Sequence, residues 1–265
     1  LDLRTHGEKL TAITKFKTDG SWYLDVFAKQ FIGSFDTTKY GAIPMIYVGL
    51  FPFLLAFLFF FVKSIRFHVK LAYLTLLVIL IASFYLQALD LFWQGMHAPN
   101  MFLHRYAWLF SLTILFMAAE VLNRIKEINW QRLCLAFSLV SIGFILTFIY
   151  RKHYHFLTSS HYVLTLEFLL VFLTVTLAFT VRKLSYTIFS AVIFFFCLFE
   201  ISINSYYQID GIANEWVFAA RSSYQGKIPA IDKLTRSLHD DQNFYRTEIL
   251  QPQTGNDSMK YNFRG

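Results

Sequence analysis

The chain has 265 residues, of which 56% are hydrophobic and only 15% charged, with 31 phenylalanines. This is more apolar surface than a soluble domain of this size can bury, so the composition excludes an ordinary soluble protein and predicts an integral membrane protein whose first partner is the lipid bilayer. The net charge of +7 does not indicate a nucleic-acid partner, because the basic residues fall in short clusters between apolar runs. The sequence begins at Leu1 and stops without a domain end, so we expect a part of a longer protein.

Residues 1–42 are mixed and polar. Turn signals at Asp19-Gly20 and Gly33-Ser34 flank a short amphipathic run, residues 22–32. We therefore expect an extracytoplasmic surface loop with one short amphipathic helix.

Six apolar segments follow within residues 43–204. Each has about 18 to 22 residues, the length that a helix needs to cross roughly 30 Å of hydrocarbon. Pro44 suits the start of the first helix, and Pro52 is expected to kink it. The predicted fold class is thus mainly α, a polytopic membrane helix bundle. The six predicted spans are 43–62, 69–89, 101–122, 133–150, 161–181 and 185–204.

Three alternate loops hold most of the basic residues between the spans, which predicts that these loops are cytoplasmic. Both ends of the chain and the hairpin at residues 91–110 are then extracytoplasmic. Cys134 and Cys197 lie within spans, so the sequence predicts neither a disulfide framework nor a metal site. The basic residues of the three loops are Lys63, Arg66 and Lys70, then Arg124, Lys126 and Arg132, and finally Arg182 and Lys183.

The hairpin at residues 91–110 is the most polar stretch between two spans. Pro99 and Asn100 predict a helix start at Met101, with Arg105 just past the first turn. A helix N-terminus with an adjacent cation suits an anion such as a phosphate. Alternatively, Arg105 extends to ordinary lipid headgroups. The candidate substrate-binding residues are Arg105, His104, Asn100, His97 and Asp90.

Carboxylates inside the spans are costly unless they are paired or hydrated. Glu167 and Glu200 lie in the outer halves of their spans and are the candidate catalytic residues of this chain. In the simpler interpretation, one of them is a structural partner of Arg105, or both are hydrated. Glu120 lies four residues before Arg124, which predicts a surface ion pair.

Residues 205–265 contain no long apolar runs. A helix is expected to open at Pro229, and residues 243–250 alternate in a way that suits a strand. We expect the start of an extracytoplasmic α/β or β domain. No nucleotide-binding or nucleophile motif occurs, so transfer chemistry would need an activated donor that is already in the membrane.

Three pieces of sequence, in order and spacing, resemble the YfhO family of bacterial membrane proteins. They are YGAIPMIYVGLFPFLLAFLFFFV at residues 40–62, LFWQGMHAPNMFLHRYAWLFSLTILFMAAEVL at 91–122, and NFYRTE with NDSMKYNFRG near the end. The resemblance implies a GT-C-type glycosyltransferase in the bacterial plasma membrane. Such an enzyme would use a polyprenyl-phosphate sugar, without a further cofactor, to glycosylate a cell-wall polymer such as teichoic acid on the outer face.

In that fold the essential acidic residue lies in the first outward loop, so the main catalytic base is expected outside this chain. The alternative function is a transporter or flippase for a lipid-linked or ionic substrate. Helices broken at mid-membrane would favour transport.

Overall fold

The computed structural model describes residues 20–96, 103–216, 221–226 and 228–237. Residues up to Glu215 belong to one compact unit, and residues from Trp216 onward belong to a second. Five helical stretches of the first unit are long and apolar enough to cross a membrane, which confirms a helical membrane bundle. They are α3 (Phe67–Tyr85), the 3-10 turn η3 (Arg105–Ala107) with α5 (Trp108–Leu122), α6 (Trp130–Ile149), α7 (Ser159–Thr180) and α8 (Tyr186–Glu215).

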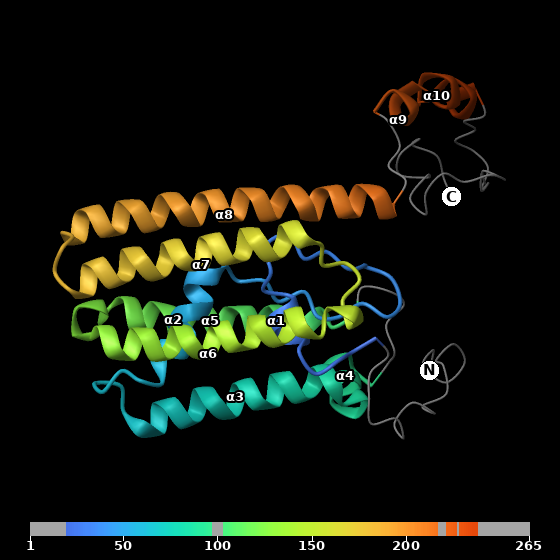
Figure 1. Ribbon diagram of the computed structural model, residues 1–265. Helices are drawn as coiled ribbons and strands as arrows, with labels where there is room; N and C mark the ends of the chain where they lie inside the picture. Colours follow the sequence, from blue (N-terminus) through green and yellow to red (C-terminus); the bar gives the residue numbers. More distant parts are fainter. Residues whose placement is uncertain (1–19, 97–102, 217–220, 227, 238–265) are drawn as a thin grey trace. The chain divides into compact units, whose positions relative to one another are not determined.

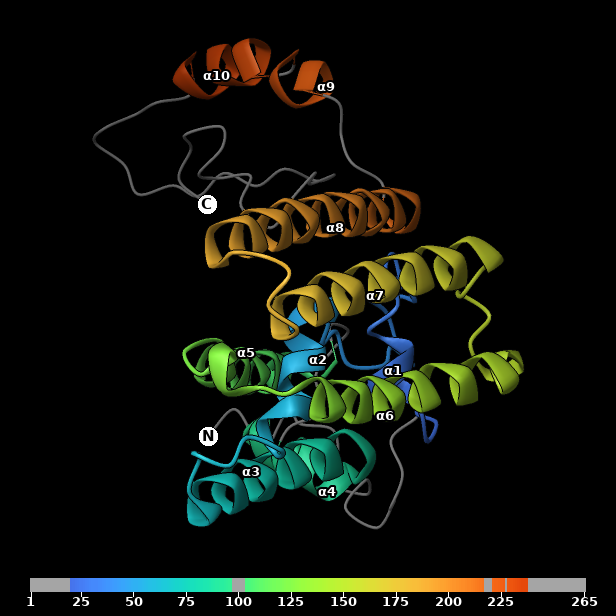
Figure 2. The ribbon, with the colours of Figure 1, turned by 60° about the vertical axis from the view of Figure 1, so that its left-hand side comes forward.

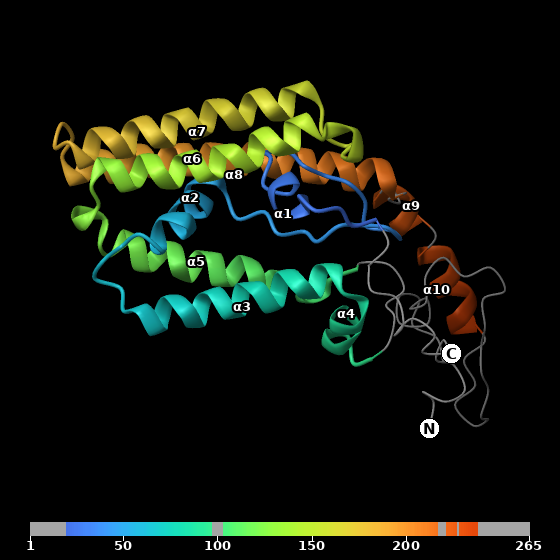
Figure 3. The same cartoon turned by 60° about the horizontal axis from the view of Figure 1, so that its bottom comes forward.

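The long helices form two groups with a short helix between them. In Figure 1 and Figure 2, α8, α7 and α6 follow one another from the top. Figure 3 shows these three helices on one side of α2, and α3 and α5 on the other. The short helix α2 (Leu50–Phe59) packs against α5, α6 and α7, and so occupies the centre. The remaining short elements of this unit are α1 (Asp25–Ala28), α4 (Gln87–Trp93), η4 (Ile125–Glu127) and η5 (Arg151–His153).

The first predicted span, residues 43–62, is wrong as a full membrane helix. Residues 42–49 are extended or irregular, and α2 covers only Leu50–Phe59. A proline ring clashes with the carbonyl four residues earlier in a helix, so a helix containing Pro52 must begin within its preceding turn. Gly49, with φ of 87°, lies just before that start. Pro52 therefore sits in the first turn of α2 and does not kink a longer helix.

Much of the described chain before α2 lies inside the bundle rather than in the surface loop that the sequence predicts, although Tyr23 and Tyr40 are exposed. We call residues 20–49 the inserted segment. It contains α1, and its Ala28, Phe31 and Ile32 are at most 2% exposed. Within this segment, α1 packs against α6 in the bundle (Figure 3). The predicted helix is present, shortened to four residues.

Backbone that is not helical is tolerated at membrane depth only where protein groups satisfy it. Polar side chains of α7 and α8 do this for the inserted segment. The amide of Ile32 donates to Thr165 Oγ1 at 3.1 Å, and the amide of Gly33 donates to Asn204 Oδ1 at 2.9 Å. The polar residues within these two helices thus hold a segment that enters between them and α5.

The second unit contains α9 (Arg221–Gly226) and α10 (Ile228–Ser237) in its described part. The helix expected to open at Pro229 is therefore present. The strand predicted at residues 243–250 lies outside the described residues, and the α/β or β character of the domain stays a prediction.

Candidate functional site

Glu200 is fully enclosed by protein. It is 1% exposed, and its Oε1 accepts hydrogen bonds from the Tyr47 hydroxyl at 2.5 Å and from the Leu50 amide at 2.7 Å. Leu50 is the first residue of α2, so this carboxylate also compensates the partial positive charge of that helix end. The arrangement gives Glu200 a structural role in anchoring α2 to α8.

Glu167 has a different environment from Glu200. It is exposed on α7 between the exposed Val163, Leu166 and Leu170. Within the described chain, neither Glu167 nor Glu200 pairs with Arg105, so the structural ion pair considered above does not form. The predicted surface pair is confirmed, because Arg124 donates to the Glu120 carboxylate within the same helical turn.

The helix expected from Met101 begins later than predicted. Leu103 and His104 are not helical, His104 has a left-handed φ of 55°, and the helical stretch starts with η3 at Arg105. Arg105 is therefore at the helix end rather than one turn inside it. His97 and Asn100 lie outside the described residues, and their predicted contribution stays a prediction.

Asp90, in α4, and His104, just before η3, lie in contact with each other. Their side chains are buried, and His104 Nδ1 lies 3.0 Å from Asp90 Oδ1. The Tyr106 hydroxyl lies 2.9 Å from the same Asp90 oxygen and 2.7 Å from the carbonyl oxygen of Ser83. A carboxylate that holds one ring nitrogen fixes the orientation of the imidazole. The left-handed backbone of His104 is a conformation that costs a non-glycine residue free energy, so packing must hold it there.

A cavity of about 230 Å³ lies between this cluster and the inserted segment. His104, Arg105 and Trp108 line it from one side, and Thr37 and Thr38 line it from the other. The guanidinium of Arg105 borders this space, whereas the hydroxyls of Thr37 and Thr38 donate to the Glu215 carboxylate. The rest of the lining is mostly apolar. Of these side chains, Arg105 suits an anionic oxygen group.

The two threonines are held in place by the end of α8. The Glu215 carboxylate accepts hydrogen bonds from both hydroxyls and from the Thr38 amide, the last at 2.8 Å. The cavity wall is consequently tied to a long helix as well as to the inserted segment. Nothing in the sequence pattern pointed to Glu215, because the pairing joins residues 177 positions apart.

A second set of buried charges lies in the inserted segment itself. Lys29 Nζ is 2.5 Å from Asp36 Oδ1, and both side chains are at most 9% exposed. The Asp25 carboxylate accepts from the Trp22 amide at 2.8 Å and from the Tyr154 hydroxyl at 3.0 Å. Burial, with the Asp25 carboxylate as the next cause, raises the pKa of the Tyr154 hydroxyl well above its usual value. Tyr154 therefore stays protonated and donates to Asp25.

The long apolar helices and the largely buried non-helical segment define a multi-pass helical membrane protein, and the cavity beside Arg105 is its candidate site. The family model described as Bacterial membrane protein YfhO matches residues 1–265, so the chain belongs to the YfhO family of bacterial membrane proteins. No curated protein and no solved structure matches the chain.

Proposed function

We propose that this chain is part of a membrane glycosyltransferase that uses a polyprenyl-phosphate sugar to modify a cell-wall polymer, such as teichoic acid, outside the cell. The observation that supports this function is the cavity lined by Arg105, His104 and the two threonines. Arg105 has the geometry to hold two phosphate oxygens, because its guanidinium presents parallel N–H donors. In this proposal Asp90 orients His104, and neither Glu167 nor Glu200 is the main base, which lies elsewhere in the protein.

The proposed orientation places this cavity on the outer face. The loops after α2, α5 and α7, which hold the basic clusters, lie at one end of the bundle in Figures 1 and 3. The start of α5, and therefore Arg105, lies at the opposite end. Because basic loops are retained in the cytoplasm, Arg105 faces outward.

Transport is the second candidate function, since the first apolar segment is non-helical before α2 begins at Leu50, inside the bundle. Transporters of this kind usually pair two interrupted helices around a central substrate site. Among the described helices, the five long ones run without a break. In addition, Glu200 already compensates the α2 end, so this break does not present an open ion site. These observations favour the transferase.

The test uses the full-length protein in nanodiscs and measures binding and turnover of a polyprenyl-phosphate sugar. Arg105→Lys should keep the charge and weaken donor binding. Arg105→Ala should weaken donor binding about tenfold to a hundredfold, because the loss of one charge-assisted hydrogen bond changes the affinity by this factor. The control is Lys152→Ala, which removes an exposed positive charge from the loop after α6. Equal donor binding by all four proteins would leave only a lipid-headgroup role for Arg105.

A further inference from the structure

The Glu215 carboxylate occupies three hydrogen-bond donors of the inserted segment. Its Oε2 accepts from the Thr38 hydroxyl at 2.6 Å and from the Thr38 amide at 2.8 Å, and its Oε1 accepts from the Thr37 hydroxyl. The next residue, Lys39, is basic. Two hydroxyls and an amide that converge on one carboxylate also suit a phosphate, because a phosphate presents acceptor oxygens of the same kind.

These donors border the candidate site. Thr37 and Thr38 line the same cavity as Arg105. An anion in this cavity therefore has Arg105 on one side and the two threonines on the other. Glu215 acts against such an anion in two ways, because its carboxylate holds the threonine donors and because like charges repel each other.

Glu215 lies at an unfavourable place for an acid whose role is only to stabilise. It is the last residue of α8, and the C-terminal end of a helix carries a partial negative charge that disfavours a carboxylate. It is also the last residue of the first compact unit, and the second unit begins at Trp216. A change in the second unit can therefore act on the Glu215 contact through the backbone.

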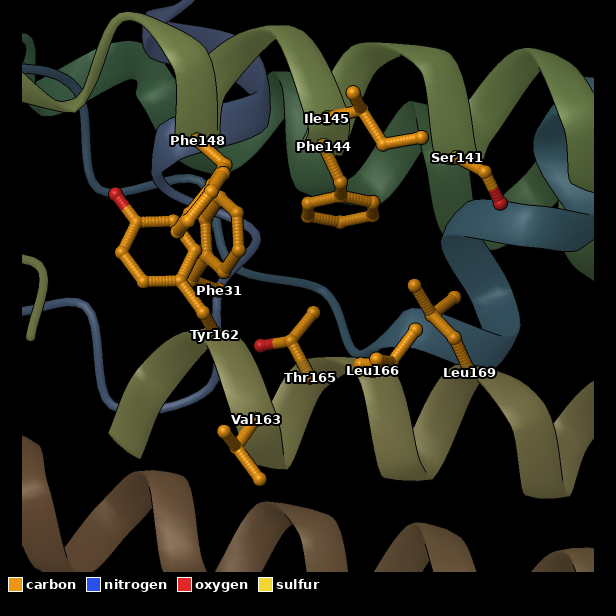
Figure 4. A pocket seen from close by; sticks show the side chains of 10 residues that line it. All are labelled: Phe31, Ser141, Phe144, Ile145, Phe148, Tyr162, Val163, Thr165, Leu166 and Leu169. Atoms are coloured by element: carbon orange, nitrogen blue, oxygen red, sulfur yellow. The ribbon is translucent and has the colours of Figure 1, made fainter. Parts of the chain in front are cut away.

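The inserted segment is also anchored without Glu215. The Phe31 ring packs among aromatic rings of α6 and α7 (Figure 4), and its centroid lies 4.8 Å from those of both Phe144 and Tyr162. The two amides that follow Phe31 donate to polar side chains of α7 and α8. Loss of the Glu215 contact should thus release the two threonines and leave the segment inside the bundle.

We propose that Glu215 makes an autoinhibitory contact, in which its carboxylate occupies the donors of Thr37 and Thr38 until the phosphate of the lipid-linked donor replaces it. The inference rests on the proposed function for the identity of the phosphate. Once the carboxylate has left, both hydroxyls and the Thr38 amide donate to the phosphate that Arg105 holds. Glu215 thereby limits how tightly the donor binds.

The test measures the affinity of full-length protein, in nanodiscs of neutral lipid, for geranyl phosphate. Glu215→Ala should strengthen binding about threefold to tenfold, because one or more hydrogen bonds to the phosphate become possible. Glu215→Gln should strengthen binding less, since its amide oxygen still accepts from the threonines. The matched control is Asp210→Ala, which removes an exposed carboxylate of α8 whose hydrogen bond is to Asn214 of the same helix. Its affinity should equal that of wild type.

A second arm tests whether the threonines receive the phosphate. Thr38→Val alone should change the affinity little, because Glu215 already holds this hydroxyl. In the Glu215→Ala background, Thr38→Val should cancel about a threefold part of the gain, because the released hydroxyl is then missing. The two changes are therefore expected to be non-additive, as for residues that share one ligand.

Equal or weaker binding by Glu215→Ala, or no binding by either protein, would overturn the proposal and leave Glu215 as a structural tie. An equal gain in Asp210→Ala would reduce the effect to general charge repulsion. A gain that Thr38→Val leaves intact would place the phosphate away from the threonines. If Glu215→Ala does not fold, Glu215→Gln carries the same comparisons. Failure of the proposed function looks different, because Glu215→Ala would still bind geranyl phosphate more tightly than wild type while no sugar was transferred from a polyprenyl-phosphate sugar.

Discussion

The Tyr47 hydroxyl lies 2.5 Å from the carboxylate of Glu200, although the two residues are 153 positions apart. The same carboxylate oxygen accepts from the amide of Leu50, the first residue of α2. One buried acid in α8 thereby satisfies both a side chain and a helix end of the chain that enters the bundle. A carboxylate that would be costly alone in a membrane is compensated by these donors.

Replacing Glu200 by Ala should destabilise the protein, because the Tyr47 hydroxyl and the Leu50 amide then lack their acceptor. The expected loss is about 1–3 kcal/mol for buried donors left unpaired, measured as a fall in Tm of the detergent-solubilised full-length protein. Glu167→Ala is the control, since Glu167 is exposed and has no hydrogen bond to any described residue. A Tm that is equal in both variants would contradict the structural role of Glu200.

The apolar helices could be predicted from the sequence, because length and hydropathy alone decide whether a helix spans hydrocarbon. The inserted segment could not. Its backbone is held by Thr165 and Asn204, and Glu200 accepts from its Tyr47 hydroxyl. No local pattern reveals such partners in other helices. The sequence does contain a reason why the first apolar segment is not one long helix. Pro52 and Gly49 lie within an otherwise apolar run, and the helix begins between them.

The sequence names Asp90, His104 and Arg105 as candidate substrate-binding residues, and this role stays a prediction. In the structure His104 and Arg105 line one cavity, and Asp90 lies against His104. The opposite wall at Thr37 and its support by Glu215 depend on the tertiary fold. The sequence predicts the same role for Glu167 and Glu200, because both lie in the outer halves of their spans. Position along a helix does not show which face is buried, and the structure buries Glu200 and exposes Glu167.

The buried pair of Lys29 and Asp36 gives a second prediction. Lys29→Met should cost about 3–5 kcal/mol, because Asp36 is left as an uncompensated charge in the bundle. The double variant Lys29→Met with Asp36→Asn removes that charge and should recover part of the loss. Thermal unfolding of the single and double variants checks this, and a double variant that is less stable than Lys29→Met would refute it.

Gly143 gives a prediction for packing. A methyl group at this position of α6 would overlap the Phe27 ring, which belongs to α1. Gly143→Ala should therefore separate α1 from α6 and cost about 1–3 kcal/mol through overpacking. Gly226→Ala, in open space in α9, is the control and should leave the Tm within error. An unchanged Tm for Gly143→Ala would mean that the inserted segment does not depend on this contact.

The last prediction concerns orientation, which rests on the basic loops at one end of the bundle. In a background with Cys134 and Cys197 replaced by Ser, single cysteines are placed at Ser64 and Ser159, both exposed. Ser64 lies in the loop after α2, and Ser159 begins α7 at the opposite end (Figure 1). An impermeant thiol reagent applied to intact cells should label position 159 and spare position 64, because retained positive charge keeps the loop after α2 in the cytoplasm. Permeabilised cells should label both. The reverse pattern in intact cells would invert the topology, place Arg105 in the cytoplasm and remove the basis for an extracytoplasmic donor site.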